Sequence, residues 1–222
     1  TQYAGSTTST STQSYLFYHW YEDVRSQALY TSVELGGSAG TITSMSFYAN
    51  SSSSYAMNNA NLKLINTTNT TLNSTFVGGA TTVWSGTITV STSGWYTFTF
   101  TTPFNYTGGN LIAELCFDNS AYSGGPPVAK AYSAGATRYH YRYVDGGTGC
   151  VLTSGSTSST VPIMKCELAS SITTAWTSNV GSSPYDLSST STLNPTCSAT
   201  ATQTYTLTAT DNSNGCSASD QV

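Results

Sequence analysis

Residues 25–50, RSQALYTSVELGGSAGTITSMSFYAN, decide the fold class. Two runs in this stretch, Gln27–Val33 and Thr41–Ala49, alternate apolar and polar side chains, and a turn with Gly36 and Gly37 separates them. Alternation with a period of two predicts half-buried β-strands. The stretch carries almost no charge and no group of residues typical of catalysis. It therefore predicts a β-sheet surface.

Composition extends this prediction to the whole chain of 222 residues. Only 7% of the residues are charged, and Ser and Thr together make up about a third. β-Branched and aromatic residues favour strands, whereas residues that favour helix interiors are scarce. We expect an all-β protein, an antiparallel jelly-roll-like β-sandwich of two packed sheets. Further strands are predicted at Tyr15–Tyr21, Asn61–Ile65, Val83–Val90, Trp95–Thr101, Leu111–Phe117, Arg138–Val144 and Val161–Leu168.

A shift in composition after Leu168 predicts two domains. Residues 1–168 carry the sandwich, with a flexible Ser- and Thr-rich lead-in over residues 1–14. Residues 169–222 are richer still in Ser and Thr and predict a small immunoglobulin-like module. This length is short for a seven-stranded immunoglobulin sandwich, and the sequence stops where a closing strand is expected. Either more chain follows, or a neighbouring subunit supplies the missing strand.

Five cysteines predict disulfides formed in an oxidising compartment. No C-x-x-C pair occurs and the chain has only two histidines, so a zinc site is not expected. Cys197 and Cys216 flank a predicted strand and its turn and are expected to pair, as are Cys150 and Cys166. Cys116, among apolar strand neighbours, is then left as a buried thiol.

Charge and hydropathy bear on partners and location. The net charge is −4 with only six basic residues, so nucleic acid is not an expected partner. No run of eighteen apolar residues exists, so no membrane-spanning helix is expected. The chain begins with Thr1, which indicates removal of a secretion signal unless the chain was trimmed by hand. We expect an extracellular or cell-surface protein.

No catalytic constellation stands out. A serine nucleophile needs a base, and His19 and His140 both lie in aromatic strand patterns without a G-x-S-x-G motif. Glu34 and Glu114 are interpreted as structural acids that pair with Arg25 or Lys63. We therefore do not expect an enzyme. Glycoside hydrolysis needs a pair of carboxylates, and such a pair can be drawn from seven acidic residues that no local motif distinguishes: Glu22, Asp23, Glu34, Glu114, Asp118, Asp145 and Glu167.

Two kinds of binding site remain open. Tyr139, Tyr141 and Tyr143 alternate on one strand face, and Trp20 offers another aromatic platform, so sugar rings can stack there unless the face is core. The oxygen-rich turns that begin at Asp118 and Asp145 are candidates for calcium, although neither matches an EF-hand loop. No other cofactor is expected.

Short segments resemble domains of known surface proteins. The second module resembles the immunoglobulin-like repeats of large Bacteroidota adhesins at Asn194-Pro195-Thr196, Tyr205–Thr208 and Gly215-Cys216-Ser217. The first resembles β-sandwich domains of exported surface proteins of the same bacteria. That resemblance is carried by Arg25-Ser26-Gln27, Leu29-Tyr30-Thr31, Glu34-Leu35-Gly36, Ile42–Tyr48, Gly94-Trp95-Tyr96, Pro103–Tyr106 and Asn110-Leu111-Ile112. It implies export and display rather than a reaction.

These observations predict a non-enzymatic structural or adhesive protein, a subunit or repeat of a surface filament or large adhesin. Lys and Pro normally guard exposed strand edges, and both are rare in this chain. Strand edges are therefore expected to join further copies of the chain or of a filament. The alternative is a carbohydrate-binding module of a larger exported enzyme.

Overall fold

The computed structural model describes residues 1–169, 172–180, 186–211 and 216–222. Apart from one 3-10 turn, Gly149–Val151, the regular structure of these residues is β-strand, which confirms the all-β prediction. The chain divides into two units, Thr1–Ala169 and Ser170–Val222, one residue beyond the predicted boundary. The described residues include no helix with the length and apolar character needed to cross a bilayer.

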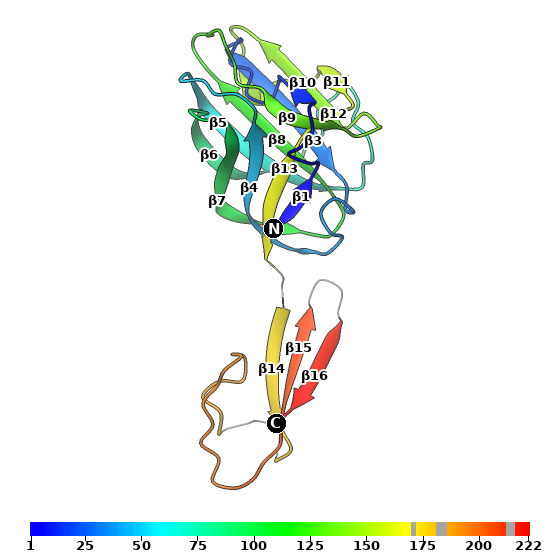
Figure 1. Ribbon diagram of the computed structural model, residues 1–222, viewed down its shortest axis with the longest axis vertical. Coiled ribbons are helices and arrows are strands. Elements are labelled where there is room, and N and C mark those ends of the chain that lie inside the picture. Colours follow the sequence, from blue (N-terminus) through cyan, green and yellow to red (C-terminus); the bar gives the residue numbers. More distant parts are fainter. Residues whose placement is uncertain (170–171, 181–185, 212–215) are drawn as a thin grey trace. The chain divides into compact units, whose positions relative to one another are not determined.

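Unit 1 is a sandwich of two antiparallel sheets (Figure 1). Its core lies between them, where Met45 and Phe47 of one sheet pack in the same cluster as Leu115 and Phe117 of the other. The first sheet has the order β1 (Gln2–Ala4), β13 (Met164–Ala169), β4 (Gly40–Ala49), β9 (Ala129–Ser133) and β12 (Thr160–Pro162), with β2 (Thr12–Gln13) on β9 and β7 (Gly94–Tyr106) on β4. The second has the order β11 (Ser156–Ser158), β10 (Tyr139–Val144), β3 (Asp23–Tyr30), β8 (Asn110–Asp118), β5 (Ala56–Thr67) and β6 (Thr81–Thr89).

The stretch that decides the fold connects the two sheets. β3 belongs to the second sheet and β4 to the first, so the glycine turn carries the chain from one layer to the other. β3 ends at Tyr30, three residues before the predicted end, because the Gly37 N–H donates back to the Ser32 carbonyl at 2.7 Å. Gly36 and Gly37 have φ of +79° and +71°, a conformation that favours glycine.

Two predictions about the N-terminal region are wrong. Tyr15–Tyr21 is not a strand but a series of turns, because its aromatic rings pack on β10: the rings of Tyr15 and Tyr141 stack 3.9 Å apart. The lead-in is not a flexible segment, because β1 pairs with β13 and β2 pairs with β9. Ala4 is fully buried, and the buried Gln13 donates from Nε2 to the Thr160 carbonyl at 2.9 Å.

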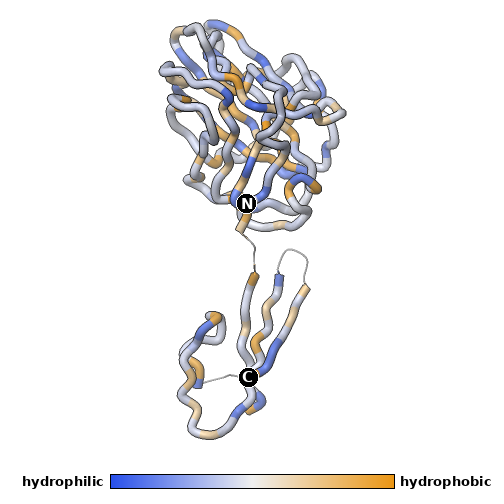
Figure 2. Tube along the Cα trace, in the orientation of Figure 1, coloured by the Kyte–Doolittle hydropathy of each residue, from blue (hydrophilic) through white to orange (hydrophobic). Residues whose placement is uncertain are grey.

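Unit 2 contains one antiparallel sheet with the order β14 (Ile172–Ser178), β15 (Tyr205–Asp211) and β16 (Ser217–Gln221) (Figure 1). Its strands show mostly pale tones of intermediate hydropathy (Figure 2). Tyr205 is its one buried apolar side chain within the part of the chain that the structure describes. No second sheet faces these strands among the described residues.

The predicted disulfide pairs are both wrong. Cys116 bonds to Cys150, with Cα atoms 5.1 Å apart, and Cys166 is a buried free thiol. Cys116 lies on the outer face of β8 because its neighbours Leu115 and Phe117 point into the core, whereas Cys166 lies in the core on the other sheet.

Cys197 is also a free thiol, so its predicted bond to Cys216 is not formed. The Cys197 sulfur lies 3.5 Å from the hydroxyl of Tyr205, at the first residue of β15. Cys216 pairs through its carbonyl with Asp211, at the last residue of β15. Six residues of strand span about 20 Å, well beyond the reach of a disulfide.

Candidate functional site

β16 is an edge strand, and half of its backbone groups point away from β15. Tyr205 and Val222 exchange both backbone hydrogen bonds, at 2.8 and 2.9 Å, and the Asp211 N–H donates to the Cys216 carbonyl. Because bonded and non-bonded pairs alternate along antiparallel strands, Ser217, Ser219 and Gln221 direct their N–H and C=O groups outward. All five side chains of β16 are exposed, and the strand contains neither Lys nor Pro.

Among the described residues of unit 2, one of these outward groups has a partner. The Gln221 N–H donates to Oδ1 of Asp220 at 2.8 Å, an exposed contact. The outward groups of Ser217 and Ser219 have no partner within the described ranges of unit 2. No strand of the described part of unit 2 pairs with this side of β16.

The two faces of this sheet differ in character. The register places Trp176 beside Leu207 on one face, and Ala209 beside Ala218 on the same face. The opposite face consists mainly of hydroxyl-bearing side chains, such as Thr206, Thr208 and Ser219. A hollow of about 530 Å³ lies against the apolar face; its lining includes Trp176, Leu193, Pro195, Cys197, Tyr205 and Val222. The sheet thus has an apolar face that its own chain covers incompletely.

Unit 1 has a long edge strand as well, but β6 is guarded. Its pairing with β5 shifts register twice, and bulges of this kind disrupt the flat edge that a new strand needs. The carbonyl of Val83, at one of these bulges, accepts a hydrogen bond from the hydroxyl of Thr101 at 3.2 Å. β16 is therefore the better edge for strand addition.

The tyrosines predicted to bind sugars are packed against other tyrosines. Tyr139 is fully buried, and Tyr141 lies beneath Tyr15 with ring planes 7° apart. Tyr143 contacts Tyr15 at 5.5 Å and Tyr21 at 4.3 Å between ring centroids. The alternative reading, that this face is core, is therefore correct for Tyr139 and largely so for Tyr141 and Tyr143. Trp20, the fourth predicted residue, is 51% exposed.

The acids predicted to bind calcium flank a buried aspartate. Asp118 pairs with Asp23 across β3 and β8, and Asp145 follows Val144, the β10 partner of Asp23. Burial raises the pKa of Asp23, and the charges of Asp118 and Asp145 raise it further. Asp145 Oδ1 accepts from the Glu22 N–H at 3.1 Å. No group of three or more acidic, His or Cys side chains that could hold a metal ion occurs in the described ranges.

His19 contacts two serines. Its Nε2 lies 3.0 Å from the Ser53 hydroxyl, and its Nδ1 lies 3.1 Å from the Ser123 carbonyl. The Ser123 hydroxyl also lies 3.0 Å from Nδ1, so both ring nitrogens have hydrogen-bond partners. A catalytic serine has a comparable base, but here the ring is fully buried and its orienting group is not a carboxylate. The histidine therefore connects loops.

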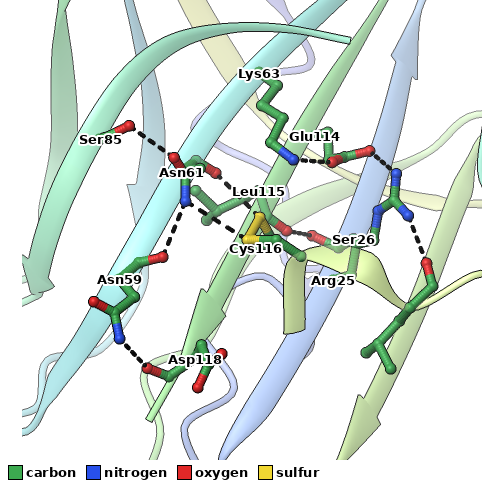
Figure 3. Close-up of a disulfide and its surroundings, with 12 residues drawn as sticks. Arg25, Ser26, Asn59, Asn61, Lys63, Ser85, Glu114, Leu115, Cys116 and Asp118 are labelled. Atoms are coloured by element: carbon green, nitrogen blue, oxygen red, sulfur yellow. Dashed lines mark hydrogen bonds and ion pairs between the residues drawn. A yellow bond between two sulfur atoms is a disulfide. The ribbon is translucent and has the colours of Figure 1, made fainter. Parts of the chain in front are cut away.

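A polar row crosses the outer face of the second sheet. The register aligns His140, Gln27, Glu114 and Lys63 across β10, β3, β8 and β5. The fully buried Glu114 accepts from Gln27 at 2.7 Å. It also accepts from Arg25 at 2.7 Å and from Lys63 at 3.1 Å, and the Cys116–Cys150 bond lies beside these residues (Figure 3). Both predicted partners of Glu114 are thus present.

The connection between β5 and β6 covers this polar row. Gln27 holds Val77 with two hydrogen bonds, at 2.8 and 3.0 Å. Phe76 stacks on His140 at 3.8 Å, and the Arg25 guanidinium lies 4.4 Å from the centre of the Phe76 ring. Burial lowers the pKa of His140 to about 4, and the charge of Arg25 contributes. His140, Gln27 and Glu114 are all buried beneath this connection.

A scan against protein-family models, a search of curated proteins and a search of solved structures each found no match for this chain.

Proposed function

We propose that this protein is an exported, non-enzymatic structural and adhesive unit that joins further copies of itself through the edge of β16. The observation that carries the proposal is the combination of an edge strand without Lys or Pro and an incompletely covered apolar face in the same small sheet. Strand addition at such an edge gains main-chain hydrogen bonds, and side chains on alternate positions supply specificity.

β16 is complementary to itself in an antiparallel pair. With a two-fold axis at Ser219, each Ser219 faces the Ser219 of the second copy, and Ser217 faces Gln221. These are the residues whose backbone groups point outward, so the pairing satisfies them all. Asp220, the only charged residue of the strand, faces Ala218 and lies diagonal to the second Asp220. No like charges are placed directly opposite each other.

The apolar sides of the two copies lie on the same surface of the joined sheet. An axis perpendicular to the sheet keeps the Trp176 and Leu207 side of both copies on one surface. Asp220 pairs with Leu207 and lies on this surface, so the two Asp220 carboxylates stand at the junction between the apolar sides of the two copies. Export is supported by the Cys116–Cys150 disulfide, because such bonds persist in oxidising compartments.

The test is the solution mass of the full chain over a range of concentrations, compared with Ser219→Pro. Proline at position 219 removes an N–H that points away from β15, so the sheet of unit 2 stays intact. We expect dimers or longer assemblies for the wild type and monomers for Ser219→Pro. Ser217→Thr is the matched control, since it keeps the backbone N–H. A wild-type chain that stays monomeric at millimolar concentration refutes the proposal.

A further inference from the structure

Three exposed aromatic side chains lie on three neighbouring loops of unit 1. Trp20 follows β2, Tyr55 precedes β5 and Tyr122 follows β8. They are 51%, 54% and 64% exposed, respectively. Large aromatic side chains gathered at the surface mark binding sites more often than isolated ones do.

A single buried histidine connects these loops. His19 precedes Trp20, its Nε2 bonds the Ser53 hydroxyl, and its Nδ1 bonds Ser123, which follows Tyr122. The Ser123 N–H donates back to the His19 carbonyl at 2.9 Å, and the His19 ring lies 5.7 Å from the Tyr55 ring. The aromatic side chains are therefore presented by loops that hydrogen bonds hold in position.

Trp20 and Tyr122 line one hollow together with Tyr21 and Asp145, with a volume of about 240 Å³. Its acidic wall is fixed as well: Asp145 Oδ1 accepts from the Glu22 N–H, and Glu22 Oε2 accepts from the Gly146 N–H at 2.8 Å. The second carboxylate oxygen of Asp145 has no hydrogen-bond partner among the described residues. The hollow thus offers aromatic faces and a free acceptor.

We infer that this hollow binds a neutral carbohydrate. The apolar C–H face of a sugar ring stacks on tryptophan and tyrosine, and its hydroxyls donate to a carboxylate. The lining contains one carboxylate and no Lys or Arg, so a uronate or sulfated sugar is repelled. The volume lies below the range of about 300–1,000 Å³ that encloses drug-sized ligands, which suits one ring of a longer chain. Loops already held in place reduce the ordering cost of binding.

This inference is independent of assembly through β16, because its residues lie in unit 1. Affinity electrophoresis of the full chain tests it, in native gels that contain xylan, β-glucan, galactomannan or agarose as neutral probes. Gels with alginate or polygalacturonate provide the anionic comparison. We expect retardation by at least one neutral polysaccharide and none by the anionic ones.

Variants assign the binding to the hollow. Trp20→Ala and Tyr122→Ala are each expected to weaken retardation at least tenfold, and Asp145→Asn severalfold, without a change in melting temperature because these side chains are exposed. Tyr3→Ala is the matched control, since Tyr3 is 56% exposed elsewhere in unit 1. The inference is overturned if no neutral polysaccharide retards the chain, or if Trp20→Ala is retarded like the wild type. It is also overturned if Trp20→Ala changes only the solution mass, which assigns the aromatic residues to a protein contact.

Discussion

Glu34 and Arg138 form a two-pronged ion pair, with Nη1 to Oε2 at 2.6 Å and Nη2 to Oε1 at 2.9 Å. Glu34 lies in the turn that connects β3 of one sheet to β4 of the other, and Arg138 lies just before β10. The pair therefore holds this connection against the strand next to β3. Tyr132 and Thr31 also donate to the Glu34 carboxylate.

The pH dependence of stability follows from this pair. Burial alone would raise the pKa of Glu34, but the hydrogen bonds from Arg138, Tyr132 and Thr31 outweigh it and lower the pKa from 4.5 to about 2. The stabilisation is complete above pH 4.5 and is lost as the pH falls toward 2. Glu34→Gln is expected to cost about 3 kcal/mol at pH 7. Urea unfolding between pH 2 and 7 measures the pH dependence and the cost of the substitution. If the free energy of unfolding of Glu34→Gln falls between pH 4.5 and 2 as steeply as that of the wild type, the prediction is contradicted.

His140 predicts a second and separate acid response. Its pKa is lowered from 6.5 to about 4, so the unfolded chain takes up a proton first and stability falls as the pH falls from 6.5 to 4. His140→Phe keeps the stack on Phe76 and removes two buried ring nitrogens that have no hydrogen-bond partner. The variant is expected to be stabilised by about 1 kcal/mol at pH 7 and to lose the slope between pH 4 and 6.5. A destabilised variant with the slope retained argues against this.

The buried carboxylate of Glu114 neutralises two cations. Glu114→Gln leaves Arg25 and Lys63 without their acid, and we expect a loss of about 3–5 kcal/mol in the free energy of unfolding. Lys63→Met is the control, because Arg25 still pairs with Glu114 and the loss is expected to stay near 1 kcal/mol. Equal losses in the two variants would show that the charge left unpaired by Glu114→Gln is not the main cause of its destabilisation.

The Cys116–Cys150 bond constrains a loop with a sequence separation of 34 residues. A loop of that size predicts a contribution of about 4 kcal/mol to the free energy of unfolding. The double variant Cys116→Ala, Cys150→Ala is compared by urea unfolding with Cys197→Ser, which alters an exposed thiol of unit 2. The prediction fails if both variants unfold at the same urea concentration.

The sequence predicted the local structure more accurately than it predicted the pairings between distant segments. Alternation in Thr41–Ala49 located β4 to within one residue, because its apolar side chains face the core. The same pattern failed for Tyr15–Tyr21, where the rings stack on one another and on β10 rather than line a strand.

The site residues show the same limit. Trp20 was identified as an aromatic platform, but its neighbours Tyr55 and Tyr122 were not, because three loops meet there only in the folded chain. Cysteine spacing did not find the disulfide, since Cys116 and Cys150 meet through a 3-10 turn that packs on β8.

Intermolecular crosslinking at position 219 tests assembly through β16 most directly. A two-fold antiparallel junction places the two Ser219 Cα atoms about 5.5 Å apart, within disulfide range, and the two Ser217 Cα atoms about 14 Å apart. In full chains with Cys197→Ser and Cys216→Ser, Ser219→Cys is predicted to form a covalent dimer on mild oxidation, and Ser217→Cys is predicted to form no covalent dimer. Equal dimer yields from the two variants, or none from Ser219→Cys, would contradict the account.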